Sequence, residues 1–230
     1  MTRHSYQLSA EISIRYDCGM ANAMKRSWWR LPAGVAANLL TIGLFTAQAQ
    51  SPAVSPTELV AKLRQGGYVL VMRHASSPRE APTKEVANAD NTKLERQLDA
   101  AGRRAAQAMG QALRDLHIPV GDVFTSPTYR ALETVKLARL ANPRPVSELG
   151  DGGQSMQSVG VPQAAWLRAS AAKAPASGNT IIVTHMPNIA LAFPAWGSVA
   201  DGETVVLHPD GKGSFDLVGR IKIEEWPQLR

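Results

Sequence analysis

Cysteine is almost absent from this sequence, because Cys18 is the only one among 230 residues. One thiol cannot form an intrachain disulfide or a cysteine-based metal site, and Cys18 lies in a segment that we expect the mature protein to lose. Disulfides, thiol catalysis and cysteine-ligated metals are therefore excluded together. The sequence also contains no Gly-rich Walker loop, no dinucleotide-binding fingerprint, no internal repeat and no low-complexity tract.

Acidic residues are fewer than basic ones, which gives the chain a formal net charge of +6. Residues 50–230 hold 20 Lys and Arg against 17 Asp and Glu, a net charge of +3, so half of the charge belongs to the first 49 residues. We therefore expect no nucleic-acid partner. With 44% hydrophobic and 19% charged residues, the composition is that of a globular protein, and the length allows one domain plus a processed segment.

The N-terminal segment has the three parts of an export signal. A basic stretch with Lys25, Arg26 and Arg30 precedes a mostly apolar, uncharged run over residues 31–45. Residues 47–49, Ala-Gln-Ala, have small side chains at the spacing that a signal peptidase accepts. The apolar run is shorter than the roughly 20 residues of a membrane-spanning helix. We interpret residues 24–49 as a signal peptide, with an uncleaved anchor as the alternative.

This interpretation divides the chain into three parts. Because a signal peptide carries its basic part at its start, translation is expected to begin at Met24 or Met20, and residues 1–23 are interpreted as an over-extended reading frame. Residues 50–230 then form the mature chain, a single domain that begins at Gln50. We expect it to be periplasmic or secreted, without stable membrane insertion after cleavage.

The mature chain alternates between strand and helix patterns. Short apolar runs predict strands over residues 68–73, 123–125, 144–149 and 181–184. Helices are predicted over residues 56–65, 101–116, 127–139 and 162–172 and from residue 187, with Ser55 and Ser126 as caps of the first and third. Residues 204–207 and 215–223 flank a hairpin turn. This order predicts a three-layer α/β/α sandwich with a mostly parallel central sheet.

Three of the predicted strands end in residues that suit an anion. Arg73 and His74 end the first strand, the second leads into a helix whose first turn carries Arg130, and His185 follows the fourth. Because ligands of an open parallel sheet bind beyond the carboxyl ends of its strands, these side chains are expected to converge. Two guanidinium groups and a helix N-terminus suit a phosphate monoester dianion. Without a nucleotide-binding loop, that phosphate is expected to be transferred.

Phosphoryl transfer at such a site requires a nucleophile, cations and a proton donor. A neutral imidazole can attack phosphorus, so one of the two histidines can be the nucleophile while the other, protonated beside the dianion, donates to an oxygen. Glu148, just before a Gly-rich segment, is the candidate proton donor. We expect no metal and no cofactor. A zinc site on His74 and His185 would need further ligands, and no His-x-His or His-x-x-x-His pair exists.

Four ordered motifs resemble those of the histidine phosphatase (phosphoglycerate-mutase-like) superfamily. Residues 71–75, Val-Met-Arg-His-Ala, are similar to its Arg-His-Gly motif, and residues 98–102, Leu-Asp-Ala-Ala-Gly, to its Leu-Thr-x-x-Gly. Residues 125–134, Thr-Ser-Pro-Thr-Tyr-Arg-Ala-Leu-Glu-Thr, resemble Ser-Ser-Pro-x-x-Arg-Ala-x-x-Thr, and residues 183–187, Val-Thr-His-Met-Pro, resemble Val-x-His-x-Pro. The resemblance spans residues 68–190.

The resemblance implies a role for each candidate residue. It makes His74 the phosphorylated nucleophile, places Arg73, Arg130 and His185 around the phosphoryl group, and makes Glu148 the proton donor of the first branch. Ala75 departs from the usual Gly, as in short phosphohistidine phosphatases. The motif that normally follows the acid is replaced by Gly-Asp-Gly-Gly at residues 150–153, so Asp151 is the alternative donor. Met186 stands where the second branch has Asp, which disfavours that branch.

Other polar residues are interpreted without a catalytic role. His117 and His208 are assigned to packing or to the surface. Arg79, Lys84, Lys93 and Arg96, in the long polar segment over residues 76–97, are expected to be solvated. Ser76 and Ser77 could either donate to phosphate or start a turn. A polar connection of this length is uncommon unless it covers a functional site.

Together these observations predict an exported, metal-independent phosphomonoesterase that acts through a phosphohistidine. The partner is a small phosphate ester or a phosphorylated peptide, and the sequence does not choose between them or predict an oligomeric state. Two alternatives use the same fold: a non-catalytic protein that binds phosphate ligands, and a phosphotransferase of the phosphoglycerate-mutase type. The mutase fits export poorly, because its substrates are cytosolic.

Overall fold

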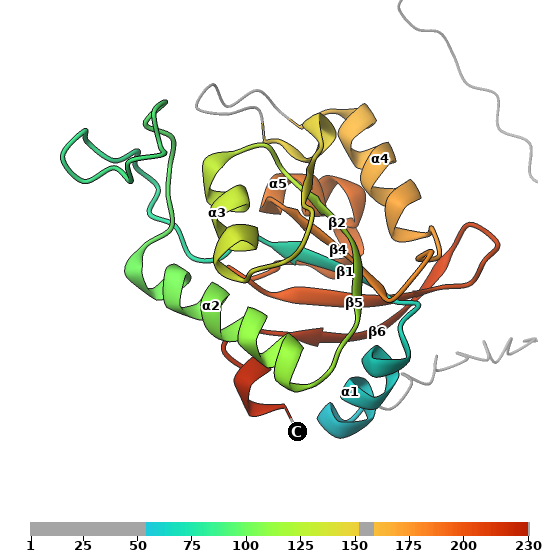
Figure 1. The fold of residues 1–230 in the computed structure, drawn as a ribbon. Helices are drawn as coiled ribbons and strands as arrows, with labels where there is room; N and C mark the ends of the chain where they lie inside the picture. The colour runs from blue at the N-terminus through green and yellow to red at the C-terminus, as the bar shows by residue number, and fades with distance from the viewer. Residues whose placement is uncertain (1–53, 152–158, 230) are drawn as a thin grey trace, which may run out of the picture. The chain divides into compact units, whose positions relative to one another are not determined.

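A computed structural model of the chain describes residues 54–151 and 159–229. Its centre is a six-stranded sheet with the order β3-β2-β4-β1-β5-β6 (Figure 1). The first four of these strands run parallel, β5 pairs antiparallel with β1, and β6 pairs antiparallel with β5. The strands are β1 (Val69–Arg73), β2 (Val120–Thr125), β3 (Arg144–Pro145), β4 (Asn179–Thr184), β5 (Thr204–Pro209) and β6 (Phe215–Ile221).

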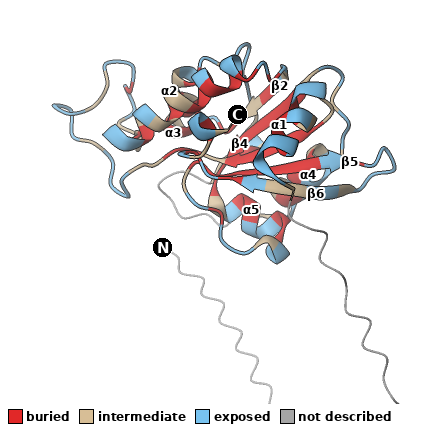
Figure 2. Ribbon diagram, turned by 90° about the horizontal axis from the view of Figure 1, so that it is seen from below, coloured by how far each residue is buried: buried red, intermediate tan, exposed pale blue. Residues whose placement is uncertain are grey.

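Helices cover both faces of the sheet, and the alternation of side chains along β1 shows how. Leu70 and Met72 pack in one hydrophobic cluster with helices α1 (Pro56–Gln65), α2 (Ala100–Asp115) and α3 (Tyr129–Leu137). Val69 and Val71 pack in a second cluster with α4 (Val161–Ala171) and α5 (Met186–Ala192). Figure 2 shows the buried strands between these layers. Because successive residues of a strand face opposite sides of a sheet, the two clusters lie on its two faces. The predicted three-layer α/β/α sandwich with a mostly parallel sheet is therefore confirmed.

The described residues all belong to one compact unit, Gln50–Arg230. None of the helices in the described ranges is long and apolar enough to cross a membrane. The predicted signal peptide, residues 24–49, and the segment over residues 1–23 lie outside the described residues.

Several predicted boundaries are confirmed. Helix α1 begins at Pro56, and the backbone N–H of Glu58 donates to the Ser55 hydroxyl at 3.2 Å, as expected for a capping serine. Strands β5 and β6 form the predicted hairpin. Strand β4 is buried along its whole length, as its run of apolar residues predicts.

Two local predictions are wrong. Helix α3 begins at Tyr129, with Thr128 in the N-cap position, and the Ser126 hydroxyl accepts from the Thr128 backbone N–H at 3.2 Å and lies 2.8 Å from Nε2 of His185. The third strand is shorter than residues 144–149: β3 ends at Pro145, and Ser147–Leu149 forms a 3-10 turn. This turn places Leu149 in the cluster beneath α4, where it is fully buried.

The long polar segment after β1 forms no helix or strand between residues 74 and 99, and it extends beside α2 and α3 (Figure 1). The segment is held in place by Glu133 of α3, which is only 5% exposed. The Glu133 carboxylate accepts hydrogen bonds from the Asn88 side chain at 2.9 Å and the Leu98 backbone at 2.8 Å, and pairs with Arg103 at 2.6 Å. A buried carboxylate with three donors therefore docks the segment on α3.

Candidate active site

The ends of three neighbouring strands bring the two candidate histidines together. His74 follows β1 and His185 follows β4, and these strands pair in parallel with Arg73 opposite Thr184. The ring centroids of the two histidines are 5.1 Å apart with an edge-to-face geometry. Arg130 reaches the same place from the first turn of α3, which follows β2. His74, Arg130 and His185 are 4%, 5% and 1% exposed, so these three groups form a buried cluster.

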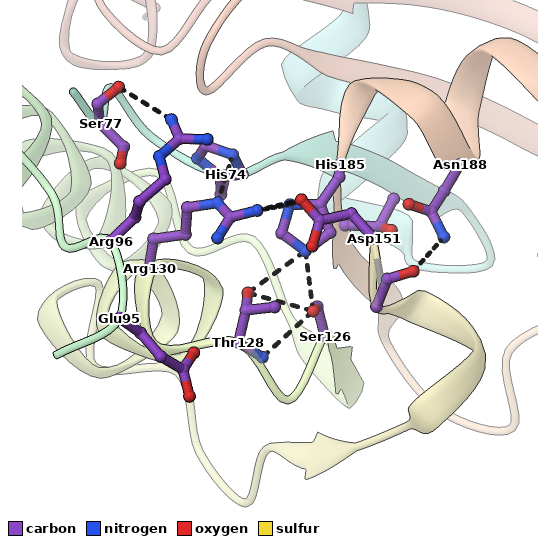
Figure 3. Close-up of polar contacts among 12 residues, drawn as sticks. His74, Ser77, Glu95, Arg96, Ser126, Thr128, Arg130, Asp151, His185 and Asn188 are labelled. Carbon is purple, nitrogen blue, oxygen red and sulfur yellow. Dashed lines mark hydrogen bonds and ion pairs between the residues drawn. The ribbon is translucent and has the colours of Figure 1, made fainter. Parts of the chain in front are cut away.

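The Arg130 guanidinium bridges the two imidazoles (Figure 3). Its Nε donates to Nε2 of His74 at 3.1 Å, and its Nη2 lies 3.1 Å from Nδ1 of His185. Arg130 is itself buried, and that burial lowers its pKa below the ordinary value. A buried cation between two imidazoles is a strong site for a dianion, because arginine offers several donors in one plane.

A backbone carbonyl fixes the tautomer of His74. Nδ1 lies 2.7 Å from the Ala75 carbonyl oxygen, which can only accept, so Nδ1 carries the proton. The pKa of His74 is lowered from 6.5 to about 3, chiefly by burial and also by the charges of Arg130 and Arg73, against the opposite effect of that carbonyl. The imidazole is therefore neutral at ordinary pH, with its lone pair on Nε2, the atom that faces Arg130.

His185 is oriented by hydroxyl groups that follow β2. Its Nε2 lies 2.8 Å from the Ser126 hydroxyl and 3.2 Å from that of Thr128. Burial, and then the charge of Arg130, hold the pKa of His185 well below its usual range. Ser126 was predicted to be a helix cap, and no site role was predicted for Thr128. The Thr-Ser-Pro-Thr order of the motif was the available signal for both.

The structure places Asp151 in this cluster and gives Glu148 different partners. The Asp151 carboxylate forms an ion pair with Nη2 of Arg130 and lies 3.7 Å from Nδ1 of His185. The Glu148 carboxylate accepts from the hydroxyl of its neighbour Ser147 at 2.7 Å, and this hydrogen bond lowers its pKa below 4.5. Of the two candidate proton donors, Asp151 is therefore the one in contact with the histidine and arginine groups.

Backbone contacts hold the segment that carries both acids. The Asn188 side chain, in the first turn of α5, donates to the carbonyl oxygens of Glu148 at 3.2 Å and Gly150 at 2.9 Å. The Thr184 hydroxyl donates to the Leu149 carbonyl at 2.8 Å. These bonds tie the segment directly to the end of β4, so that Asp151 lies beside His185. The rest of the Gly-rich segment, residues 152–158, lies outside the described residues.

Arg73 lies at the edge of the cluster. It forms an ion pair with Asp201 at 2.6 Å and donates from Nη1 to the Val199 carbonyl at 2.9 Å. Its Nε is buried without a hydrogen-bond partner in the described structure. Because a buried N–H without an acceptor is costly, this donor is suited to an oxygen of a bound anion. No local pattern in the sequence points to Asp201, which lies far from Arg73 along the chain.

Arg96 is not the solvated surface residue that the sequence analysis expected. Its Nε donates to the Pro78 carbonyl at 2.6 Å and its Nη2 to that of Ser77 at 3.2 Å, and burial lowers its pKa below the ordinary value. Its charge also contributes to the low pKa of His74 and His185. It lines a cavity of about 430 Å³ whose wall also includes Lys93, Glu95, Thr128, Arg130 and Asp151.

Ser76 and Ser77, which could either donate to phosphate or start a turn, both form hydrogen bonds within the polar segment. The Ser76 hydroxyl donates to Asp99 at 2.6 Å, and Asp99 in turn caps helix α2 by accepting from the Gly102 N–H at 2.7 Å. The Ser77 hydroxyl lies 2.9 Å from the Gln97 carbonyl oxygen. Both hydroxyls therefore support the fold of the polar segment. Lys84, by contrast, is exposed, as expected.

Comparison with known proteins finds a family model that matches part of the chain. The model of the histidine phosphatase superfamily (branch 1) matches residues 69–151, a segment that contains Arg73, His74, Arg130 and Asp151 and ends before His185. Over these residues the chain resembles branch 1 of the histidine phosphatase superfamily, whose name states a phosphatase activity. No curated protein matches the chain.

Solved structures resemble this chain at low sequence identity. The protein histidine phosphatase SixA, solved with tungstate, is 16% identical with a TM-score of 0.50, covering 69% of this chain and 98% of its own. A candidate phosphohistidine phosphatase SixA from Agrobacterium tumefaciens is 16% identical with a TM-score of 0.48, covering 67% and 97%. One from Nakamurella multipartitia is 24% identical with a TM-score of 0.44, covering 71% and 90%. The first of these establishes the fold, and the substrates named for these proteins are theirs.

Proposed function

We propose that this protein is a histidine phosphatase, namely an exported, metal-independent phosphomonoesterase that acts through a phosphohistidine on a small phosphorylated substrate. The observation that carries the proposal is the state of His74. Its Nδ1 is 2.7 Å from a carbonyl oxygen, and burial together with the nearby arginine charges lowers its pKa to about 3, which leaves a neutral imidazole with the Nε2 lone pair beside Arg130. A buried, neutral imidazole next to a dedicated cation is suited to attack an anionic phosphoryl group.

In the first step, the phosphoryl dianion lies among Arg73, Arg130 and His185. The Nε2 lone pair of His74 forms a bond to phosphorus while the ester P–O bond breaks with its electron pair on the leaving oxygen, which takes a proton from the carboxylic acid form of the proton donor. The two guanidinium groups stabilise the charge on the other oxygens. A dianion beside His185 raises the pKa of that imidazole by favouring its protonated form, so that His185 can donate to an oxygen.

In the second step, water attacks the phosphohistidine, the N–P bond breaks, and inorganic phosphate leaves with His74 neutral again. The proton donor of the first step accepts the proton of this water. We assign this exchange to Asp151, because its carboxylate contacts Arg130 and approaches His185, whereas the Glu148 carboxylate is hydrogen-bonded to Ser147. Glu148, the donor expected from the sequence, is the alternative that the experiments must separate.

Trapping of the intermediate tests the proposal directly. The full chain is incubated briefly with radiolabelled 4-nitrophenyl phosphate and quenched at high pH. One base-stable, acid-labile phosphoryl group is expected on His74, because phosphoramidates hydrolyse in acid. His74→Ala should lose both the adduct and turnover, and His185→Ala should slow both steps while the adduct still forms on His74.

The same experiment separates the alternatives. A phosphate-binding protein without catalysis would bind inorganic phosphate and form no adduct. A mutase-type phosphotransferase would form the adduct and pass it to a second substrate, with little release to water. Excess chelator should leave turnover unchanged, since the proposed site neutralises phosphate with guanidinium groups. Phosphate trapped on His185 in the His74→Ala variant would refute the mechanism.

A further inference from the structure

We infer that the groove between helices α2 and α3 is a binding site for a soluble, linear anion with several phosphate groups, such as a short polyphosphate chain. The groove has a volume of about 720 Å³, which lies within the range of roughly 300–1,000 Å³ for small-molecule sites. None of the described residues that line it also lines the cavity beside the histidines. The inference therefore concerns a second site and is independent of the proposed function.

The two helices form the walls of this groove. They lie side by side on one face of the sheet (Figure 1), and Gly110 of α2 packs against the backbone of Ala138 at the end of α3. On α2 the lining residues recur every three or four positions, which places them on one side of the helix. The groove is lined by Arg104, Gln107, Ala108, Gln111, Arg114, Lys136, Leu137 and Arg139.

The groove is positively charged along its length. Four of its lining residues are basic and none is acidic. Residues 50–230 hold 20 Lys and Arg against 17 Asp and Glu, an excess of three, so this single groove holds more cations than that excess. Arg104 and Arg114 are ten residues apart on α2, which separates their Cα atoms by about 15 Å. A linear anion with several phosphate groups matches this spacing better than a single phosphate.

Two of the four cations are fully available to a ligand. Arg104 and Arg139 are exposed, and neither forms an ion pair within the described part of the chain. Lys136 pairs with Asp90 at 2.6 Å, and both of these side chains are more than half exposed. Such a pair contributes little in water, so Lys136 can exchange its partner for a bound anion.

Arg114 provides a fixed group of donors in the same groove. Its Nη1 donates to the Ala138 carbonyl at 3.0 Å and its Nη2 to the side-chain oxygen of Gln111 at 3.1 Å. Both partners are neutral, so they orient the guanidinium without neutralising it. Asp115, the nearest acid along the chain, accepts from the Gln111 amide at 2.7 Å and does not line the groove. An oriented guanidinium with further N–H groups in one plane suits phosphate oxygens.

The surroundings of the groove favour a soluble ligand over a lipid surface. Binding to a membrane surface combines basic residues with an apolar face that enters the lipid. The large hydrophobic residues exposed in the described ranges are Val86, Val161, Leu191 and Leu217, and none of them lines the groove. Leu137, which does line it, is partly buried against the core. This surface therefore has the charge for phosphate groups without an apolar side chain that would enter a membrane.

Calorimetry with tripolyphosphate and with inorganic phosphate tests the inference on the full chain. At low salt, the unaltered chain should bind tripolyphosphate, and the affinity should fall as salt screens the exposed charges. The combined Arg104→Gln and Arg139→Gln substitutions should weaken this binding by about tenfold or more, because two unpaired cations are lost. Their effect on inorganic phosphate, which is too short to span the groove, should be smaller.

Matched variants complete the design. Lys173→Gln and Lys212→Gln remove exposed cations that do not line the groove, and both should leave the affinity unchanged. The groove and control variants should all unfold at the same denaturant concentration as the unaltered chain, since the altered side chains are exposed. Arg130→Gln should remove anion binding among the histidines and leave tripolyphosphate binding in the groove.

Three results would overturn the inference. The first is equal tripolyphosphate affinity in the groove variants and in the control variants. The second is a loss of tripolyphosphate binding in Arg130→Gln alone, because the anion would then occupy the cluster of histidines. The third is binding to phosphatidylglycerol vesicles that depends on Arg104 and Arg139 without binding of tripolyphosphate, because the groove would then recognise a lipid surface.

Discussion

At the scale of single residues, the site depends on two histidines that must remain neutral while no ligand is bound. His74 and His185 are buried next to Arg130, and both burial and this charge disfavour the imidazolium form. Neutrality gives His74 its nucleophilic lone pair. It also means that protonation of these residues must favour the unfolded chain, where they are solvated.

The pH dependence of stability follows from this difference. The pKa of His74 is about 3 in the folded chain and 6.5 when unperturbed. Between these values the unfolded state binds more protons, so this contribution to the free energy of unfolding is complete above pH 6.5 and is lost as the pH falls toward about 3. Denaturant titrations at several pH values should show the loss. His74→Gln should make the slope shallower, whereas His208→Gln, an exposed control, should leave it unchanged.

The proton donor can be identified by its dependence on the leaving group. Asp151→Asn should lower turnover of an alkyl phosphate by about 10²–10⁴-fold, because an alkoxide leaves poorly without a proton. It should affect 4-nitrophenyl phosphate much less, since a nitrophenolate leaves readily. Glu148→Gln is the matched variant and should show no such dependence. The reverse pattern, with Glu148 sensitive to the leaving group, would restore the assignment made from the sequence.

At the scale of secondary structure, the predictable elements were those with local signals. Ser55 and Pro56 marked the start of α1, and apolar runs marked β1 and β4, because capping and burial act over a few residues. The place of Arg96 was not predictable. It depends on Glu133, a carboxylate distant along the chain that docks the polar segment, and no spacing rule connects the two.

In the candidate site too, residues with a local sequence signal were predictable, and those placed by contacts distant along the chain were not. Arg73, His74, Arg130 and His185 could be found because each follows a predicted strand in a recognisable motif. The preference for Asp151 over Glu148 could not, since it depends on the short turn over Ser147–Leu149 and on how Asn188 holds the carbonyls around it. A strand continuing to residue 149 would have placed these two acids differently.

Close packing of α2 against α3 gives a prediction at this scale. A Cβ at Gly110 of α2 would lie 2.0 Å from the Ala138 carbonyl oxygen, which is backbone and cannot swing aside. Helix propensity alone would make Gly110→Ala stabilising by about 1 kcal/mol. The clash should win and lower the free energy of unfolding by about 1–3 kcal/mol, as measured by chemical denaturation. Gln111→Ala, at the exposed neighbouring position, should change it by less than about 0.5 kcal/mol.

At the scale of the whole molecule, the distribution of charge separates the N-terminal segment from the rest of the chain. Half of the net charge of +6 lies in residues 1–49, whereas the described elements all lie within Gln50–Arg230. A basic stretch before an apolar run is the pattern of a signal peptide, so we propose that this segment directs export, and its charge is not needed by the proposed site. Removal of residues 1–49 would take away none of the described elements, and it would leave every residue assigned to the mechanism.

This separation leads to the prediction about processing. We expect mass spectrometry of the protein recovered from its exporting host to find an N-terminus at or near Gln50, because Ala47 and Ala49 have the side chains that a signal peptidase accepts. Replacing Ala47 and Ala49 together by Arg should leave a longer, membrane-retained product. The processed chain should hydrolyse 4-nitrophenyl phosphate and yield the His74 adduct. A product that retains Met1 in the cytosol would contradict export, while an adduct formed on that unprocessed chain would leave the proposed chemistry intact.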